Sequence, residues 1–467
     1  MKKVISFFLV MLMMLTLVAC GGNTELSDTS SENQQASTET PSNKLSDKPE
    51  VSDEKLGVFD KNATLEETVM VDEGNVKIIA TGLNYSSYSV ELELTIENNS
   101  EKDLSFISGS MGYSCNSVNG YMISDGYLNC DVAAGKKVNN SISFSYDELM
   151  VYGINEIADM EIGFDISDDD YNHRYTGPRQ LKTSAFASHD YSTNHYQTTI
   201  VSCAAMNTYG YDMKYFSQDT LYDESGVKLV SSGIMVNHDG DTMLLLELEN
   251  TTSSMVYIET SDISVNGLVV NSSTWSSDAI NPGKHGIVDV DLSAVLDTEY
   301  WSIYGINEIG SVSLSLTQRD SEGMNITDEV FVEVVVPGAK AEYDSKGEEI
   351  YHNGGLRIVE KTILEDSDEY SSDIYILFLA ENNSGKTLVI DDVCDSLSVN
   401  GFMTDYSYYS TEIKNGESAV LEIKLWESSL EENKIASVSD VKEVEVGFKI
   451  KEGRNTIDEP VIKISFD

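Results

Sequence analysis

Basic residues are scarce in this sequence, and their scarcity limits the partners that the chain can have. Its 467 residues include 30 lysines and arginines against 79 aspartates and glutamates, which gives a formal net charge of −49. A surface this acidic repels nucleic acid and anionic lipid. We therefore expect no nucleic-acid partner and no polybasic contact with a membrane.

The sequence also lacks the short motifs of common catalytic sites. It contains no Gly-x-Ser-x-Gly elbow, no His-Glu-x-x-His and no Walker-type glycine loop. His189 and His195 match a zinc site poorly, because zinc takes three or four ligands at defined spacings. We expect no enzymatic activity and no cofactor, apart from a weak Ca²⁺ site that stays open at the acidic run 165–170. Pairs of catalytic carboxylates cannot be recognised among 79 acids, so a cell-wall or glycan hydrolase remains the last-ranked alternative.

Cysteine is scarce too, with five residues in the whole chain. Cys115 and Cys130 are the only two that fall within one expected domain. A disulfide between them would close a loop of about 15 residues and add about 3 kcal/mol in the chain-entropy model. The other two domains lack the pair, so the fold does not require this bond, and both the bonded and the reduced form stay open.

Long apolar runs are missing except at the start of the chain. Lys2 and Lys3 precede the apolar residues 4–18, a run too short to span a bilayer comfortably and typical of a signal peptide. The Leu-Val-Ala-Cys that follows resembles the lipobox of bacterial lipoproteins. This implies a signal peptide over residues 1–19 and a lipidated (palmitate-bearing) Cys20. We expect the protein to be held to the extracytoplasmic face of the cell membrane by this anchor.

Residues 20–61 are expected to form a disordered tether. Serine, threonine, asparagine, glutamine and glutamate dominate most of this segment. Such a composition buries too little apolar surface to offset the entropy of ordering.

The rest of the chain is organised around a tetrapeptide, Ser-Val-Asn-Gly, which occurs at residues 117–120, 264–267 and 398–401. Other features recur in phase with it, so the chain contains three copies of one domain. We place the copies at residues 62–187, 217–337 and 338–467. Residues 188–216 are a linker or an additional edge strand, with 198–203 the most strand-like part.

Each copy is predicted to be all-β. Val90, Leu92, Leu94 and Ile96 alternate with polar residues, as in a half-buried antiparallel strand, and matching strands follow 152 and 284 residues later. Long amphipathic helices between the strands are missing, which excludes a parallel α/β sheet. The pattern predicts three tandem immunoglobulin-like antiparallel β-sandwich repeats.

Two recurring motifs are expected to shape the connections. Asn-Gly in the tetrapeptide predicts a tight hairpin with positive φ at both residues. Tyr-Gly-Ile-Asn-Glu-Ile, at 152–157 and 304–309, predicts a short helix that ends at its glycine. The third copy lacks this hexapeptide, and we expect a longer helix there, over residues 428–436.

With these residues in view, the chain resembles the uncharacterised immunoglobulin-like repeat lipoproteins of Gram-positive bacteria. The lipobox at 17–20, the Gly-Val-Lys-Leu at 226–229, the Glu-Asn-Asn strand ends and the two Tyr-Gly-Ile-Asn-Glu-Ile segments carry the resemblance. It covers nearly everything from residue 62 onward and implies a fold and a compartment, but no activity.

The expected function is a non-enzymatic binding or adhesion module that presents its repeats to a cell-wall polymer, a glycan or an envelope protein. Aromatic side chains on β-sandwiches stack on sugars and are favoured in protein contacts. The candidate contact aromatics lie beside the Asn-Gly turns of the first and third copies: Tyr121, Tyr127, Tyr406, Tyr408 and Tyr409. The alternative is a structural spacer or a subunit of an envelope complex.

Overall fold

The computed structural model describes residues 58–109, 116–202, 211–237, 240–269, 277–292, 298–365 and 372–466. Over these ranges the chain is almost entirely β-structure, which confirms the expected all-β class. The α-helices of this described part have six residues each and are α1 (Tyr146–Val151), α2 (His195–Ile200), α5 (Thr298–Ile303) and α6 (Glu427–Glu432). A 3₁₀ turn, η1 (Val438–Asp440), follows α6. No helix in the described ranges has the length and apolar character to cross a membrane.

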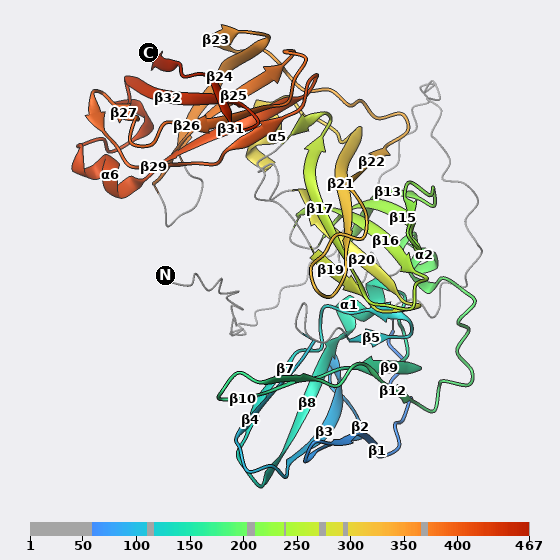
Figure 1. The fold of residues 1–467 in the computed structure, drawn as a ribbon. Helices are drawn as coiled ribbons and strands as arrows, with labels where there is room; N and C mark the ends of the chain where they lie inside the picture. The colour runs from blue at the N-terminus through green and yellow to red at the C-terminus, as the bar shows by residue number, and fades with distance from the viewer. Residues whose placement is uncertain are drawn as a thin grey trace, which may run out of the picture. The chain divides into compact units, whose positions relative to one another are not determined.

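The first repeat is a sandwich of two antiparallel layers (Figure 1). One layer has the order β1-β2-β3-β8. The other has the order β7-β4-β10-β11. The short strands β5, β9 and β12 pair with one another in the matching order β5-β9-β12. The strands are β1 (Thr68–Glu73), β2 (Val76–Tyr85), β3 (Ser89–Asn98), β4 (Leu104–Ser108), β5 (Ser117–Val118), β6 (Tyr121–Met122), β7 (Leu128–Val132), β8 (Lys136–Ser145), β9 (Asp159–Ile162), β10 (Asp165–Asp168), β11 (His173–Tyr175) and β12 (Arg179–Lys182).

This strand order is that of an immunoglobulin-type sandwich. There, strands A, B and E are neighbours in one sheet and C, F and G in the other. β2, β3 and β8 take the places of A, B and E, while β4, β10 and β11 take those of C, F and G. β1 and β7 are additional strands, one at an edge of each layer.

The second repeat has the same arrangement. β15, β16 and β20 form one layer with β13 and β14 beside β15, and β19-β17-β21-β22 form the other. The strands are β13 (Asp212–Ser217), β14 (Asp223–Glu224), β15 (Val227–Val236), β16 (Thr242–Asn250), β17 (Val256–Val265), β18 (Leu268–Val269), β19 (Ser277–Ile280), β20 (His285–Asp291), β21 (Ser311–Arg319) and β22 (Val330–Val335).

The third repeat follows the pattern again. Its layers are β23-β24-β25-β31 and β30-β26-β32-β33, and β27 and β34 also pair with the long strand β32. The strands are β23 (Glu348–Asn353), β24 (Leu356–Glu365), β25 (Ile374–Asn382), β26 (Leu388–Asp392), β27 (Ser398–Val399), β28 (Phe402–Met403), β29 (Tyr406–Tyr408), β30 (Thr411–Ile413), β31 (Ser418–Leu425), β32 (Glu443–Glu452), β33 (Asn455–Asp458) and β34 (Val461–Ser465).

Each repeat encloses its own apolar core. In β3 the side chains of Val90, Leu92, Leu94 and Ile96 are all buried, as the alternating pattern predicts. The neighbouring acids lie on the other face of the strand, because successive side chains of a strand point to opposite sides.

A buried asparagine ends the third long strand of every repeat and ties the two layers together. Asn98, Asn250 and Asn382 are each fully buried. The Nδ2 group of Asn98 donates to the backbone carbonyls of Lys102 and Val132, both at 2.8 Å. The corresponding acceptors are the carbonyls of Ser254 and Ile280 in the second repeat and of Lys386 and Ile413 in the third.

The Ser-Val-Asn-Gly turns have the backbone that the sequence predicts. Asn119, Asn266 and Asn400 have φ values of 47°, 54° and 51°, and the glycines after them have 90°, 79° and 81°. Each asparagine side chain also holds the segment before the next long strand. Asn119 Nδ2 donates to the Glu156 carbonyl, and its Oδ1 accepts from the Ala158 and Asp159 amides. Asn266 and Asn400 make the same set of bonds.

Three local expectations need comment. The helix before Gly153 does end there, at a φ of 74°, and a Cβ at this position would lie 2.3 Å from the His195 carbonyl oxygen. The strand-like reading of 198–203 is wrong, since 198–200 belong to α2. The edge strand lies further on, in β13, so the second repeat begins before residue 217. The longer helix expected at 428–436 is also wrong, because α6 is as short as α1 and α5.

Candidate functional site

The first and second repeats meet in a contact that we call the first joint. It begins at the hairpin of β5 and β6, where Tyr121 in β6 pairs in parallel with His285 in β20. The His285 amide donates to the Gly120 carbonyl at 2.9 Å, and Lys284 forms an ion pair with Glu161 at 2.8 Å. The return strand of one repeat therefore extends a sheet of the next.

A buried carboxylate, Glu247, lies at the centre of the first joint. Its side chain is fully buried and accepts hydrogen bonds from Asn194 and Gln197 of the α2 segment at 2.6 and 2.7 Å. It also contacts Ser231 Oγ at 2.7 Å and His285 Nδ1 at 2.9 Å. Burial alone would raise the pKa of Glu247, but its bonds with His285, Ser231 and Asn194 outweigh it and hold the pKa below its ordinary value. Glu247 is thus a charged anchor point between the repeats.

The second joint, between the second and third repeats, uses the same hairpin and different side chains. Leu268 and Val269 in β18 pair in parallel with Ser418 and Ala419 in β31. Tyr304, the tyrosine of the second Tyr-Gly-Ile-Asn-Glu-Ile segment, is fully buried and donates to the Phe378 carbonyl at 2.9 Å.

Further polar contacts cross the second joint. They are the bond of Tyr300 OH to Glu422 and the Lys414–Asp262 ion pair. Tyr343, in the segment between β22 and β23, adds a bond from its OH to Ser418 Oγ. Together with Tyr304, these contacts make the second hexapeptide part of a docking surface for the next repeat.

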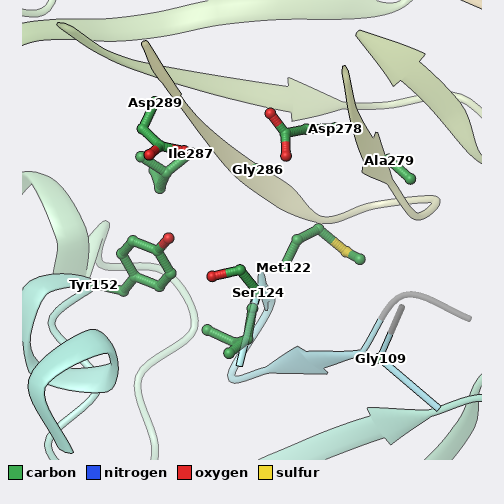
Figure 2. A pocket seen from close by; sticks show the side chains of 10 residues that line it. Gly109, Met122, Ser124, Tyr152, Asp278, Ala279, Gly286, Ile287 and Asp289 are labelled. Carbon is green, nitrogen blue, oxygen red and sulfur yellow. The ribbon is translucent and has the colours of Figure 1, made fainter. Parts of the chain in front are cut away.

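A small cavity opens at the first joint (Figure 2). Its volume is about 110 Å³. Met122, Ser124 and Tyr152 approach it from the first repeat, and Asp278 and Asp289 from β19 and β20 of the second. The cavity is therefore shared between two repeats rather than formed by one.

The acids at and near this cavity have raised pKa values. Burial and the nearby Asp289 raise the pKa of Asp278 to about 7. Partial desolvation and Asp291 raise the pKa of Asp289 as well, although its side chain remains exposed. Beneath Ser124, burial and Asp125 raise the pKa of Glu148 to about 7, despite the bonds that Glu148 accepts from the backbone amides of Ser124 and Asp125.

This cavity has the acids of a hydrolytic site but not the space. Pockets for small molecules usually measure about 300–1,000 Å³, several times more than is found here. A pair of carboxylates that cleaves a glycan must flank a sugar unit. The arrangement therefore suits a few water molecules between two repeats better than a substrate.

The aromatics expected at a contact surface fall into two groups. Tyr121 is buried in the first joint, 5% exposed, with its hydroxyl 3.0 Å from Asn194 Oδ1, so the expectation of an open contact residue is wrong for it. Tyr406 and Tyr408 are half-buried, and their hydroxyls donate to Asp392 and to the Ile390 carbonyl. Tyr127 and Tyr409 are each 56% exposed and remain available for contact.

Other sequence expectations remain untested or lie outside the described residues. Cys20 and Cys115 lie outside the described ranges, and Cys130 carries a free, half-buried thiol, so their roles stay predictions. Within those ranges no group of three His, Cys, Asp or Glu side chains is placed to hold a metal ion. At the acidic run, Lys102 Nζ lies 2.6 and 2.8 Å from Asp168 and Asp170 and forms an ion pair with both carboxylates.

Sequence reasoning missed the residues of the joints. Glu247, His285 and the cavity acids carry no motif of their own. One signal was present, because the pair after each Asn-Gly is apolar in all three copies: Tyr121 and Met122, Leu268 and Val269, Phe402 and Met403.

No family model and no curated protein matches the chain. Similar solved structures include a protein of unknown function from Porphyromonas gingivalis W83, with 11% identity over 55% of this chain and 99% of that chain and a TM-score of 0.14. The exo-chitosanase CsxA of Amycolatopsis orientalis is 9% identical over 59% of this chain and 28% of its own, with a TM-score of 0.17. The alpha-2-macroglobulin of Escherichia coli is 8% identical over 85% of this chain and 33% of its own, with a TM-score of 0.14. Scores this low carry no argument about function.

Proposed function

We propose that this chain is a lipid-anchored extracytoplasmic protein whose β-sandwich repeats form a non-enzymatic binding module. Cys20 would attach it to the membrane, and residues 20–61 would link the anchor to the first repeat. The jointed repeats would then present a contact surface to an envelope partner.

The observation that carries this proposal is the construction of the joints. Each combines parallel strand pairing, buried apolar contacts and polar bonds between neighbouring repeats. Contacts of this kind hold successive repeats in a fixed relation, as in repeat arrays that build extended binding surfaces.

Among the three partner classes, the geometry favours a protein. Tyr406 and Tyr408, two of the expected contact aromatics, are half-buried, and their hydroxyls are bonded within the third repeat, which leaves them less free to stack on a sugar. Phe402 and Met403 expose apolar surface beside strand β27 instead, and aromatic residues and methionine are enriched in protein interfaces.

The proposed anchoring is tested by Cys20→Ala in the full chain. We expect the variant to lose incorporation of labelled palmitate and to leave the membrane fraction. Retention of the label on the variant would contradict the anchor.

The binding role is tested with purified residues 51–467, which form one compact unit. Peptidoglycan, surface polysaccharide and detergent-solubilised envelope proteins are offered with and without Ca²⁺. We expect saturable retention of one envelope protein. Binding to no component would contradict the proposed binding function and favour the structural spacer. The joints would give a spacer the same stiffness.

A further inference from the structure

The third repeat carries the same hairpin as the first two, and among the described residues no other repeat covers it. Its turn residues Asn400 and Gly401 have the positive φ values of the other copies, and Asn400 makes the same bonds to Asp440, Lys442 and Glu443. β28 pairs with β27 as β6 pairs with β5. The hairpin of the docking element is therefore present in the third repeat.

What differs is the exposure of the return strand. In the first two repeats this strand is covered by the next repeat, whereas in the third it is open. The exposed fractions are 5% for Tyr121, 9% for Met122, 0% for Leu268, 9% for Val269, 55% for Phe402 and 60% for Met403. Removing the remaining apolar surface of this pair from water would favour docking.

We infer that β28 is the docking surface for a β-sandwich domain of a different protein, which binds by pairing its unpaired edge strand in parallel with β28. The inference rests on the proposed binding function and names the place and the kind of partner. It extends to the third repeat the contact that the same element makes twice within this chain.

The two internal joints define the chemistry of the acceptor strand. At each, the strand that receives the hairpin carries an apolar, outward-facing residue two positions after the first paired residue. Ile287 follows His285, and Val420 follows Ser418. Both are nearly buried, at 8% and 4% exposure, although they lie outside the core of their own repeat. The partner must offer the same combination of a free strand edge and an apolar outer face.

A second copy of this chain is a poor acceptor. The corresponding edge strand of the first repeat is β8, which has Lys137 and Asn139 at the two positions. Beside it, β3 presents Glu91 and Glu93, where the second repeat has Met243 and Leu245. Docking Phe402 here would bury carboxylates without partners, and two chains of net charge −49 also repel each other.

The contact should be weaker than the internal joints. Tyr152 and Tyr304 support the first and second joints, and the third repeat has Asn433 at this place, where it bonds to the Met403 carbonyl and to Thr404. Without a tyrosine at this place, the third hairpin offers its strand and its apolar pair alone. A weaker contact of this kind suits a partner that binds reversibly.

The test places the photoreactive residue p-benzoylphenylalanine at position 402 of the full-length chain in its own cells. A second chain carries it at position 88, because Tyr88 is 85% exposed in the first repeat and lies on no joint. We expect a cross-link from position 402 to an edge strand of a β-sandwich domain in another protein. We expect no cross-link from position 88. In parallel, Phe402→Glu should reduce recovery of that protein at least tenfold, while Tyr88→Glu leaves it unchanged.

Each other outcome overturns the inference. A partner retained by wild type and Phe402→Glu alike, with no cross-link from 402, would contradict this surface and leave the binding function standing. A cross-link from 402 to β8 of a second copy would replace the different protein with self-association. No partner in either the pull-down or the cross-linking would contradict the binding function itself. Circular dichroism of Phe402→Glu shows whether the substitution at this exposed site has left the fold intact.

Discussion

The first layer of each repeat has an outer face, turned away from its own core, and these faces differ between repeats. In the first repeat the outer face of β3 carries Glu91, Glu93 and Thr95, which are exposed or half-buried. In the third repeat the equivalent face of β25 carries Leu377 and Leu379, both fully buried against the second repeat.

The difference shows how the same fold can occupy either a terminal or an internal position in an array of repeats. A repeat that receives a neighbour needs an apolar outer face, and a terminal repeat needs a polar one to stay soluble. The first repeat therefore has the character of a cap. The acidity that dominates this sequence is not uniform, because the third repeat has Leu377 where the first repeat has Glu93.

The largest expected effect comes from exchanging these faces. Leu377→Glu would place the residue of the first repeat into the buried second joint. It removes a fully buried leucine and buries a carboxylate without a partner, so we expect the free energy of unfolding to fall by at least about 3 kcal/mol. Urea unfolding of residues 51–467, followed by tryptophan fluorescence, measures it, since Trp301 packs against this cluster.

The reverse exchange, Glu93→Leu, is the matched control. Glu93 is exposed, so its free energy of unfolding should stay within about 0.5 kcal/mol of wild type. It should, however, make the first repeat a better acceptor, with slight self-association in sedimentation. Equal losses in the two variants would mean that the outer faces do not differ in the way described.

Much of the architecture could be predicted from local sequence. The alternation around Leu92, the Asn-Gly turns and the glycine stop at Gly153 each depend on neighbouring residues, and all three are confirmed. The outer faces could have been predicted too. Met243 to Leu246 and Ile376 to Ala380 are uninterrupted apolar runs, typical of strands buried on both sides.

The sites could not be predicted in this way, because they join residues far apart in the chain. Tyr121 meets Asn194 across 73 residues, and no spacing rule connects the two. Tyr121 and Tyr127 look alike in the sequence, yet one is buried in a joint and the other is exposed. Asp278 and Asp289 become a pair only when β19 and β20 fold against the first repeat, and 79 acids hide them beforehand.

The next effect in size concerns Glu247, which occupies the place of Thr95 on the outer face of the second repeat. Glu247→Ala leaves the side chains of Asn194, Gln197 and His285 without their shared acceptor. We therefore expect the free energy of unfolding to fall by about 2–3 kcal/mol. Thr95→Ala, at the equivalent place in the first repeat, should cost less than about 1 kcal/mol. Unfolding midpoints of both variants measure the contrast, and equal costs would contradict a special role for the first joint.

Glu247 also predicts a pH dependence at acid pH. Its pKa is lowered in the folded state, so its contribution is fully present above the ordinary glutamate pKa of about 4.3 and is lost as the pH falls through the lower, folded value. Glu247→Gln should therefore differ most from wild type at pH 6 and least near pH 3. A difference that stays constant over this range would show that the charge contributes nothing.

The smallest expected effect concerns Asp278, which lies at the first joint. The equivalent position is Cys130 in the first repeat and Thr411 in the third, so the second joint has no such acid there. The pKa of Asp278 is raised to about 7, so between about pH 4 and pH 7 the folded protein holds a proton that the unfolded chain has released. Stability should fall as the pH rises through this window. Asp278→Asn stays neutral and removes the fall, so the variant should be more stable than wild type at pH 8 and similar at pH 4.5. Because the side chain is only half-buried and solvent screens it, we expect a gain of about 1 kcal/mol or less.

The exposed Asp72→Asn in the first repeat serves as the control for Asp278→Asn and should show no such dependence on pH. Asp289→Asn sharpens the test, because Asp289 contributes to the raised pKa of Asp278 and its neutralisation should reproduce part of the gain. A loss of stability in Asp278→Asn that is equal at both pH values would instead mean that the carboxylate is charged and partnered in the cavity. The first joint would then depend on a second charge besides Glu247, and its contrast with the second joint, where Leu377 and Leu379 are fully buried, would be larger than the present contacts indicate.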